Sequence, residues 1–460
     1  MVTSPPDLTP LLTRQRTFWA SGAPRQLEFR LAALKRLRQA IVDRQAEIVA
    51  AVQQDLGRPE FEGYFEVGTI SELDYVLQHL PAWVRPQPVP LALNQRPGRA
   101  WIQPQPKGVV LIIGPWNYPF QLILSPLIGA IAAGNCALVK PSELAPTTAR
   151  VLAQLVVATF DPAHVALVEG GVETAQALLA EKFDHIFFTG GERVGRLVLQ
   201  AAAPHLTPVT LELGGKSPCL VTPDIDLAVA ARRIIWGKFL NAGQTCVAPD
   251  YLLVEESLQP ALVRALQDRL RQCYGADPAQ SPDYGRIVNH HQFDRLLGLL
   301  GSGRLLQGGE SDRQSRYLAP TLIDQVSWSD PVMQEEIFGP ILPILTYHHL
   351  DEAIALINQR PQPLALYLFC RDRGVQQRVI ASTQAGTVCL NDVILQVAVW
   401  DLPFGGRGSS GLGTYHGRHS FQTFSHAQGV LQKPFWLDMD WRYPPYANKV
   451  KLFKRFLRLE

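Results

Sequence analysis

Strand and helix patterns alternate regularly along part of the chain, between residues 108 and 203. Four short apolar runs are predicted to be strands, and each is followed by a segment whose apolar residues recur at helical spacing. Strands joined by helices of this length pair in parallel through right-handed crossovers, with helices on both faces of the sheet. The predicted strands are GVVLII (108–113), CALVK (136–140), HVALVEG (164–170) and HIFFTG (185–190).

A second alternating series begins after the glycine pair at 214–215. It combines four more apolar runs with helical segments near 226–240, 257–273 and 351–358. We therefore predict two α/β domains with parallel sheets, joined near residues 212–216. The strands predicted for the second domain are CLVT (219–222), YLLVE (251–255), ALYLFC (365–370) and TVCLND (387–392).

Three other regions have distinct patterns. Residues 25–55 carry apolar positions at helical spacing and are predicted to form one long helix. Residues 86–106 contain six prolines, which exclude a helix and favour an extended arm or edge strands. The glycine-rich stretch 405–413 is predicted to lead into a tail that crosses back or reaches a partner subunit.

The last twelve residues, KVKLFKRFLRLE (449–460), form a basic amphipathic pattern. One helical face carries basic residues and the other apolar ones, so the segment is predicted to be a helix that lies on an anionic membrane or packs on the enzyme itself. The basic face consists of Lys451, Lys454, Arg455 and Arg458, and the apolar face of Leu452, Phe453, Phe456 and Leu457.

Composition excludes several classes of protein. The 43 Lys and Arg residues balance 41 Asp and Glu residues, so bulk charge gives no reason to expect nucleic-acid binding. The start, MVTSPPDLTP, lacks the features of a secretory signal, and the six cysteines include no CxxC pair; we therefore expect reduced thiols in a cytoplasmic protein. Prolines interrupt the most apolar stretch, 109–139, which argues against a spanning helix, and no metal site is predicted.

Cys246 is the candidate nucleophile. It lies in FLNAGQTCVAPDY (239–251), a polar loop between a predicted helix and strand, with Gly243 before it and Pro249 after it. An irregular loop of this kind can direct backbone N–H groups at the sulfur, and a cysteine reacts only as the thiolate. Four of the other cysteines lie in apolar strand patterns and the fifth at a helix end, where they are expected to be unreactive.

Two polar residues are candidate partners of this thiol. Glu212 ends a predicted strand in LELGGKSP (211–218), at the sheet edge where α/β proteins bind ligands, and can deprotonate a water molecule. Asn117 lies in the loop of IIGPWNYPF (112–120), and its amide can stabilise an oxyanion. Taken alone, each also fits an ordinary turn residue.

Three more motifs point to a dinucleotide. Lys140 and Glu143 in VKPSE can contact two ribose hydroxyls. It is an equally good interpretation that Lys140 lies on the surface and that Glu143 caps a helix. The glycines of FTGGERVG (188–195) lie between a strand and a helix, where a pyrophosphate can bind the helix N-terminus. In MQEEIFGPILP (333–343), Glu336 and Phe338 precede a Gly-Pro turn and alone suggest only that turn.

Together these motifs resemble the aldehyde dehydrogenase superfamily over nearly the whole chain. The motifs PWNYP, KPSE, LELGGKSP, GQTC and EEIFGP occur in the family's order. Further segments look like the class 3 branch, which contains fatty aldehyde dehydrogenases; they are CVAPDY, PFGGRGSSGLGTYHG (403–417), FSH (424–426) and RYPPY (442–446). The resemblance implies NAD(P)-dependent oxidation of medium- or long-chain aliphatic or other apolar aldehydes to carboxylic acids, through a thioester that water hydrolyses.

The resemblance also implies residue roles. Cys246 attacks the aldehyde, Asn117 and the Cys246 backbone N–H hold the oxyanion, and Glu212 activates the hydrolytic water. His416 is expected to play only a supporting part. The residues implied to bind NAD or NADP are Trp116, Lys140, Glu143, Gly190, Gly195, Glu336 and Phe338. Gly191 and Glu192 depart from the family pattern, which often has Ser or Asn followed by Thr, so a hydroxyl contact is lost and Glu192 adds a negative charge near the pyrophosphate.

The implied fold has two Rossmann-like domains and a small β oligomerisation arm, with a homodimer as the expected assembly. The cofactor domain is predicted at 1–85 and 101–211, the catalytic domain at 212–405, the arm at 86–100 and 406–440, and the C-terminal helix at 441–460. Two other reactions fit a reactive cysteine. A CoA-acylating dehydrogenase commonly lacks the carboxylate supplied here by Glu212, and a cysteine hydrolase needs a histidine, which is absent near Cys246 in sequence. A non-catalytic structural role is also conceivable, although an intact Cys246, Glu212 and Asn117 argue against it.

Overall fold

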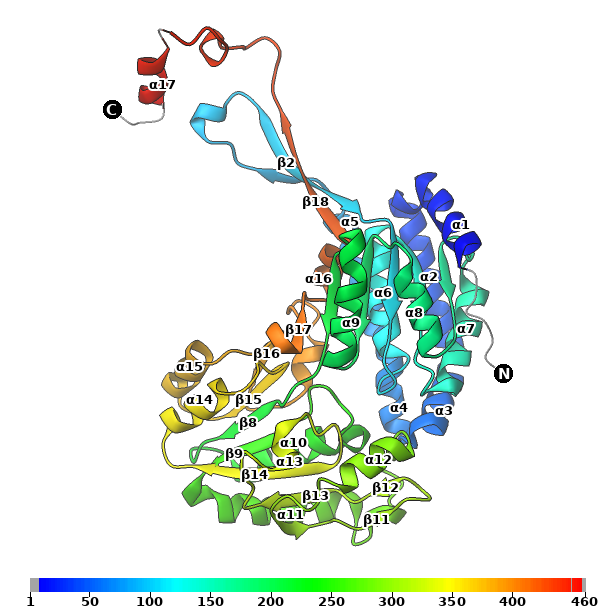
Figure 1. Ribbon diagram of the computed structural model, residues 1–460, viewed down its shortest axis with the longest axis vertical. Coiled ribbons are helices and arrows are strands. Elements are labelled where there is room, and N and C mark those ends of the chain that lie inside the picture. The colour runs from blue at the N-terminus through cyan, green and yellow to red at the C-terminus, as the bar shows by residue number, and fades with distance from the viewer. Residues whose placement is uncertain (1–7, 448, 457–460) are drawn as a thin grey trace.

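The computed structural model describes residues 8–447 and 449–456, and has two sheet-based units with an arm projecting from one end (Figure 1). The upper unit contains a six-stranded sheet of order β17-β7-β6-β3-β4-β5. Its five main strands are parallel and largely buried, as expected for a sheet covered on both faces. They are β3 (Val109–Ile113), β4 (Cys136–Lys140), β5 (Val165–Leu167), β6 (His185–Thr189) and β7 (Val209–Glu212).

Helices alternate with these strands, which confirms the predicted α/β pattern. The connecting helices are α6 (Gln121–Ala133), α7 (Pro146–Thr159), α8 (Val172–Ala180) and α9 (Glu192–Ala202). N-terminal helices complete this unit: α1 (Thr9–Ala20), α2 (Leu27–Asp43), α3 (Gln45–Leu56), α4 (Glu60–Val67) and α5 (Thr69–Trp83).

The prediction of one long helix over residues 25–55 is wrong. The chain breaks at Arg44, whose φ of −111° and ψ of 11° are not helical. The break lets the apolar faces on either side pack against partly different helices, because α2 contacts α5 and α6 and α3 contacts α4, while both contact α7. Helical spacing predicted both faces but not the change of direction between them.

The lower unit contains a seven-stranded sheet of order β10-β13-β14-β9-β8-β15-β16, parallel except for β10. Its strands are β8 (Pro218–Val221), β9 (Tyr251–Glu255), β10 (Arg304–Gln307), β13 (Thr321–Asp324), β14 (Ile341–Tyr347), β15 (Ala365–Phe369) and β16 (Thr387–Leu390), and a separate hairpin pairs β11 (Ser311–Asp312) with β12 (Tyr317–Leu318). Its helices are α10 (Leu227–Phe239), α11 (Gln259–Tyr274), α12 (His290–Leu297), α13 (Pro331–Gln334), α14 (Leu350–Asn358) and α15 (Arg373–Ser382).

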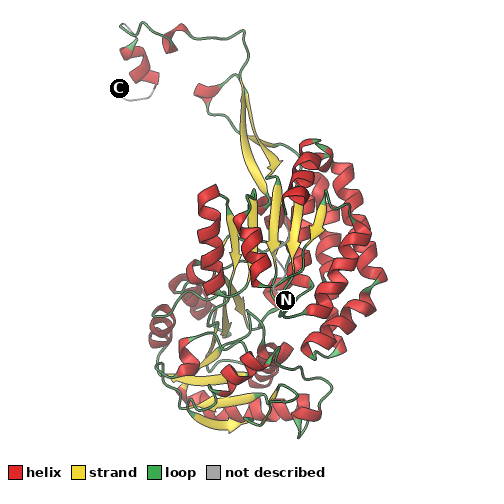
Figure 2. Cartoon of the chain, turned by 45° about the vertical axis from the view of Figure 1, so that its right-hand side comes forward, coloured by secondary structure: helices red, strands yellow, loops and turns green. Residues whose placement is uncertain are grey.

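A three-stranded antiparallel sheet forms the arm, which extends clear of both units (Figure 2). Its strands are β1 (Gln87–Val89), β2 (Arg99–Pro106) and β18 (Ser425–Gln432). β2 therefore continues past residue 100, where the arm was predicted to end. The extended conformation predicted from the prolines is confirmed.

The tail before β18 differs from the prediction that 406–440 belongs to the arm. β17 (Gly411–Leu412) pairs with β7, and α16 (Gly417–Thr423) packs on α6, so this segment crosses back onto the upper unit, which was one of the two alternatives predicted for the tail. A Cβ on Gly129 of α6 would lie only 2.5 Å from Cβ of Ser420, which explains why two small residues meet at this helix contact.

Within the described residues, the C-terminal helix is α17 (Val450–Phe456), which begins nine residues after the start predicted for the helix of 441–460. Leu457 and Arg458, which were predicted to extend its two faces, lie outside the described residues. Over residues 8–447 and 449–456, the structure contains no helix with the length and apolar character to cross a bilayer.

Candidate active site

The loop that carries Cys246 has a conformation that its sequence enforces. Asn241, Ala242 and Gly243 all have positive φ angles, of 52°, 51° and 77°. A Cβ on Gly243 would come within 2.3 Å of the Gly339 carbonyl oxygen, so only glycine fits there. The tight turn brings Cys246 to the meeting point of two cavities.

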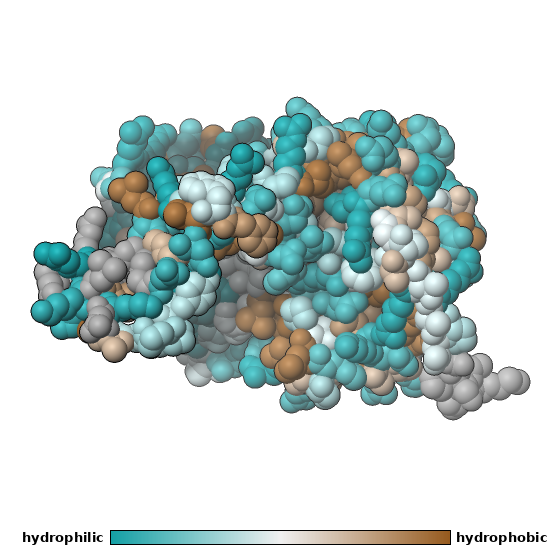
Figure 3. Space-filling model, turned by 90° about the horizontal axis from the view of Figure 1, so that it is seen from above, coloured by the Kyte–Doolittle hydropathy of each residue, from teal (hydrophilic) through white to brown (hydrophobic). Residues whose placement is uncertain are grey.

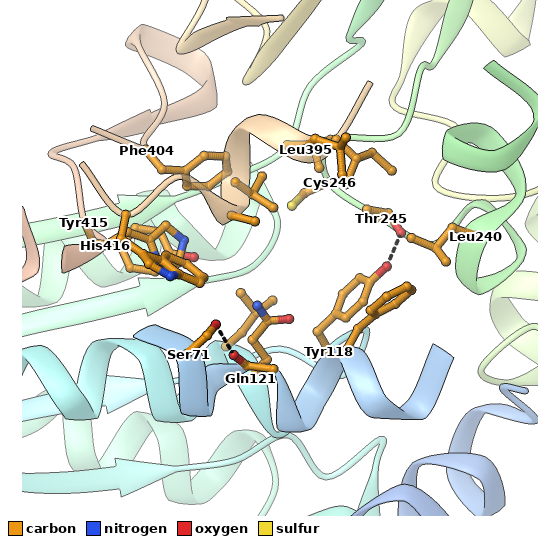
Figure 4. A pocket seen from close by; sticks show the side chains of 18 of the residues that line it. Ser71, Tyr118, Gln121, Leu240, Thr245, Cys246, Leu395, Phe404, Tyr415 and His416 are labelled. Carbon is orange, nitrogen blue, oxygen red and sulfur yellow. Dashed lines mark hydrogen bonds between the residues drawn. The ribbon is translucent and has the colours of Figure 1, made fainter. Parts of the chain in front are cut away.

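The first cavity is an apolar tunnel of about 280 Å³ (Figure 4). It is lined by residues of both units, and aromatic and aliphatic side chains dominate its wall. Representative wall residues are Tyr64, Trp236, Leu240, Leu395, Phe404 and Tyr415. The sequence did not indicate this tunnel, because its walls come from segments far apart in the chain.

The second cavity, of about 210 Å³, is lined by Asn117, Glu212 and Cys246 together. Trp116, Gly190, Glu336 and Phe338 line it as well. The structure thus brings together seven of the ten residues that the sequence singled out.

Glu212 lies at the end of β7 and is buried. Neither carboxylate oxygen has a hydrogen-bond partner. Burial raises the pKa of Glu212 well above its ordinary value of 4.5. A carboxyl group held this way in a cavity is suited to accepting a proton near neutral pH.

Asn117 is buried and oriented by two contacts. Its Nδ2 donates to the backbone oxygen of Gln244, 3.1 Å away, and its backbone oxygen accepts from Nδ2 of Asn241 at 2.9 Å. An amide nitrogen carries two hydrogens, so one N–H of Asn117 stays available to a ligand oxygen.

The surroundings of the Cys246 thiol favour its protonated form. Burial, together with the Glu336 and Glu212 carboxylates, raises its pKa to about 12. The backbone N–H groups of Cys246 and Val247 act in the opposite direction, as predicted for the loop, but burial outweighs them. The thiolate is therefore the minor form in these surroundings, and a bound ligand that changes them can increase its share.

A larger cleft of about 770 Å³ adjoins this cavity at the C-terminal ends of the strands. Lys140 and Glu143 line it and pair with each other, with Nζ and Oε2 3.0 Å apart. Gly190 and Gly191 line it where β6 leads into α9. Cleft positions of this kind bind nucleotides in α/β sheets.

Two residues of the FTGGERVG motif have other positions than expected. Gly195 does not line the cleft; a Cβ there would come within 2.8 Å of Leu213, so this glycine allows α9 to pack closely on the segment after β7. Glu192 pairs with Arg196 on the exposed side of α9 and is not a cleft residue. Arg193 does line the cleft and was not foreseen.

The loop that carries Glu336 and Phe338 is anchored by Asp250. Asp250 accepts the Ile337 backbone N–H at 2.9 Å and forms an ion pair with Lys216, with Oδ2 and Nζ 2.5 Å apart. Phe338 has a φ of 49° and its ring packs edge-on against Trp116, with 5.3 Å between centroids. Burial and Asp250 raise the pKa of Glu336 to about 8.

His416 lines the tunnel and was given only a supporting role by the sequence. Its Nδ1 lies 3.1 Å from Oε1 of Glu72, and both side chains are buried. Its ring stacks on Tyr415, with 4.0 Å between centroids. Glu72, which comes from α5, carried no signal in the sequence.

Comparison with known proteins places this arrangement in a family. The family model for the aldehyde dehydrogenase family matches residues 19–430. Aldehyde dehydrogenase family 3 member A2 of Mus musculus is 49% identical over 96% of this chain and 93% of its own length. The dimeric NADP-preferring aldehyde dehydrogenase of Canis lupus familiaris is 44% identical over 96% of this chain and 99% of its own.

A solved structure described as the substrate-bound state of Staphylococcus aureus AldH has a TM-score of 0.96 and 46% identity, covering 98% of this chain and 100% of that one. The chain therefore belongs to the aldehyde dehydrogenase family, in its class 3-like branch, and is an NAD- or NADP-dependent enzyme that oxidises aldehydes to carboxylic acids.

Proposed function

We propose that this enzyme oxidises medium- and long-chain aliphatic or other apolar aldehydes, with Cys246, Glu212 and Asn117 as its catalytic residues. The observation that supports this proposal is that Cys246 lines both the apolar tunnel and the cavity that contains Glu212 and Asn117. An alkyl chain gains about 0.8 kcal/mol for each buried methylene, so the tunnel favours long substrates.

The reaction begins when the Cys246 thiol gives its proton to water in the cavity and Sγ attacks the carbonyl carbon. The carbonyl oxygen becomes an oxyanion, to which the free N–H of Asn117 and the backbone N–H of Cys246 donate. A bound nicotinamide dinucleotide supplies the hydride acceptor for the oxidation to the thioester. Glu212 then takes a proton from water, the hydroxide attacks the thioester, and the carbon–sulfur bond breaks to release the acid.

The cleft fits a dinucleotide. A Cβ on Gly191 would meet no atom within 4 Å, which leaves the start of α9 open to a pyrophosphate. Lys140 and Glu143 would hold the adenosine ribose, and Glu336 and Phe338 the nicotinamide ribose and ring. Trp116 and Gly190 line both this cleft and the cavity that contains Glu212 and Asn117. Gly195 acts indirectly, by allowing α9 to pack closely on Leu213. We assign the cofactor to the upper unit and the nucleophile to the lower one.

Water rather than CoA is the proposed acyl acceptor, because the unpaired Glu212 carboxylate is a base for water. Assays with added CoA and detection of acyl-CoA test this alternative. The main experiment is NADH or NADPH formation across an aldehyde series from acetaldehyde to dodecanal, with mass spectrometry of the trapped adduct. An adduct on another residue, or kcat/KM that falls steadily with chain length, contradicts the proposal.

A homodimer formed through the arm is proposed as the assembly. Among the described strands, β18 pairs only with β2, so its other edge is open to strand pairing, and Leu431 on it is 55% exposed. Leu431→Asp is expected to shift the mass measured by light scattering from dimer to monomer. An unchanged mass removes the arm as the interface.

Contact of 449–460 with a membrane is a linked proposal. Lys451, Phe453 and Arg455 are exposed on the described part of α17. The view onto the arm end shows apolar groups interspersed with polar ones, which suits peripheral contact (Figure 3). Flotation with anionic vesicles that survives deletion of 449–460 excludes this role.

A further inference from the structure

An arginine with a fully buried side chain lies in the turn between α3 and α4. Nη1 of Arg58 donates to Oε1 of Glu66 at 2.6 Å, and Nη2 donates to the backbone oxygen of Glu62 at 2.8 Å. Nε lies 3.8 Å from Oε2 of Glu62. Burying these charges costs free energy even when they are paired, and none of the three residues lines the cavities at Cys246.

Glu66 holds the loop that carries Asn117. Its Oε2 accepts the backbone N–H groups of Phe120 and Gln121, at 3.2 Å and 2.7 Å, at the start of α6. α6 has no capping side chain of its own at Phe120, so Glu66 satisfies these donors from another helix. The segment from Asn117 to Phe120 is thereby fixed at its C-terminal end.

Glu62 holds the loop that carries Cys246. Its Oε2 accepts the backbone N–H of Asn241 at 2.9 Å, in the positive-φ turn. The Asn241 side chain donates in turn to the backbone oxygens of Asn117 and Gln244, at 2.9 Å and 3.2 Å. Gln244 is also the residue whose backbone oxygen orients the Asn117 amide.

A second contact joins the same two loops. The hydroxyls of Tyr118 and Thr245 lie 2.8 Å apart, as the dashed line in Figure 4 shows. The Arg58 guanidinium packs over the Tyr118 ring, 4.5 Å from its centroid. Arg58 therefore contacts the Asn117 loop directly and both carboxylates that grip the two loops.

We propose that Arg58, Glu62 and Glu66 form a clamp that holds the Asn117 amide in register with Cys246 and acts as a set of positioning residues for acylation. This inference rests on the proposed roles of Asn117 and Cys246. An N–H stabilises an oxyanion only when it points at the position where the charge develops, and a displacement of about 1 Å can cost a hundredfold in rate.

Two reactions of Cys246 separate positioning from general damage. Acylation by p-nitrophenyl acetate passes through an oxyanion, whereas alkylation by iodoacetamide displaces iodide and forms none. Both need the same thiolate, so the ratio of the two rates reports on the oxyanion contacts alone. Both can be measured on the full-length protein without a cofactor.

The test compares Glu62→Ala with Glu62→Gln. We expect Glu62→Ala to lower the acylation-to-alkylation ratio by about tenfold to a hundredfold. Glu62→Gln should stay within about threefold of the wild type, because its side-chain oxygen still accepts the Asn241 N–H. Glu60→Ala is the matched control, since Glu60 is exposed on the same helix, and its ratio should not change.

A double-mutant cycle with Asn117→Ala completes the test. If the clamp acts through Asn117, adding Glu62→Ala to Asn117→Ala lowers the ratio no further. If the losses of the two single variants multiply in the double variant, the clamp is overturned but the role of Asn117 is not. The same holds if Glu62→Ala leaves the ratio unchanged while Asn117→Ala lowers it. An unchanged ratio in Asn117→Ala overturns its proposed role and the clamp with it. If Glu62→Ala does not fold, Asn241→Gly tests the next step of the same chain of contacts. It keeps the backbone N–H that Glu62 accepts and tolerates the positive φ, but it removes the side-chain donor to the Asn117 and Gln244 carbonyl oxygens, and it is expected to give the same loss.

Discussion

The Glu336 carboxylate occupies the space that a side chain at Gly214 would need. A Cβ built on Gly214 would come within 2.1 Å of Oε2 of Glu336. The next residue, Gly215, contributes a backbone hydrogen bond to the same carboxyl group. Gly214 therefore leaves space for the carboxylate of Glu336, in the loop proposed to bind the nicotinamide ribose, and Gly215 hydrogen-bonds to it. The glycine pair does this in addition to allowing a turn.

Gly214→Ala is expected to displace Glu336 rather than unfold the protein, because the clash is with the end of a flexible side chain. The KM for the cofactor should rise about tenfold or more, which corresponds to roughly 1.4 kcal/mol of lost binding. Cofactor titration and thermal unfolding measure the two effects. Gly301→Ala is the control, since a Cβ there meets nothing within 4 Å; a lowered Tm with unchanged KM in Gly214→Ala would contradict the expectation.

The stability of the cofactor-free protein should depend on Glu336. Its pKa is about 8 in the folded protein, raised mainly by burial from an ordinary value of 4.5, so the folded state keeps a proton that the unfolded chain has released. The stabilisation linked to this proton is complete below pH 4.5 and is lost as pH rises towards 8. Glu336→Gln removes the titration, so its Tm should fall less than that of the wild type between pH 5 and pH 8. Equal pH dependence in the two proteins would count against the raised pKa.

Glu212→Gln should separate acylation from hydrolysis of the thioester. The amide cannot accept a proton from water, so a burst of NADH is expected, followed by turnover slowed by about a hundredfold or more. In the wild type, steady turnover should fall as pH is lowered through the raised pKa of Glu212, because the protonated carboxyl is no longer a base. Stopped-flow measurement of NADH checks both points, and full steady turnover in Glu212→Gln removes this residue as the base.

Much of the fold followed from local patterns. The alternation of buried strands and helices predicted β3 to β6 because each of these parallel strands is buried and is a largely continuous apolar run. The break at Arg44 was missed, and the return of 411–424 to the upper unit was predicted only as one of two alternatives, because both depend on packing partners far away in the chain. Patterns within one segment carry no information on such partners.

The same distinction applies to the site. Cys246, Glu212 and Asn117 lie at strand ends or in loops with recognisable motifs, and the structure places them around one cavity. Arg58 and Glu62 had no such signal: a charged residue near a helix start normally indicates a solvated surface, and only the tertiary structure shows that these two are buried. The tunnel walls likewise join α4, α10 and the segment around Leu395, which are remote in sequence.

Cofactor choice should depend on Glu143. Its carboxylate lines the cleft beside Lys140, where it would repel the 2′-phosphate of NADP. Glu143→Gln is expected to raise kcat/KM for NADP relative to NAD by about tenfold, since repulsion between like charges is removed while Lys140 stays. Steady-state kinetics with both cofactors measure the ratio. Glu173→Gln, a change of an acidic residue on α8 that does not line the cleft, is the control; an unchanged ratio in Glu143→Gln would place the adenosine ribose elsewhere.

Chain-length preference should depend on the tunnel entrance. Ala398 lines the tunnel but is exposed, so Ala398→Trp narrows the passage with little cost in stability. Each methylene that remains in water forfeits about 0.8 kcal/mol, or roughly a fourfold loss in kcat/KM. We therefore expect kcat/KM for decanal to fall by an order of magnitude or more in this variant while that for propanal stays within about twofold, because a three-carbon chain does not reach the entrance. Val399→Trp, one residue further and outside the tunnel wall, is the matched control and should leave both aldehydes unaffected. Equal losses for propanal and decanal would show that the apolar chain does not lie in this tunnel.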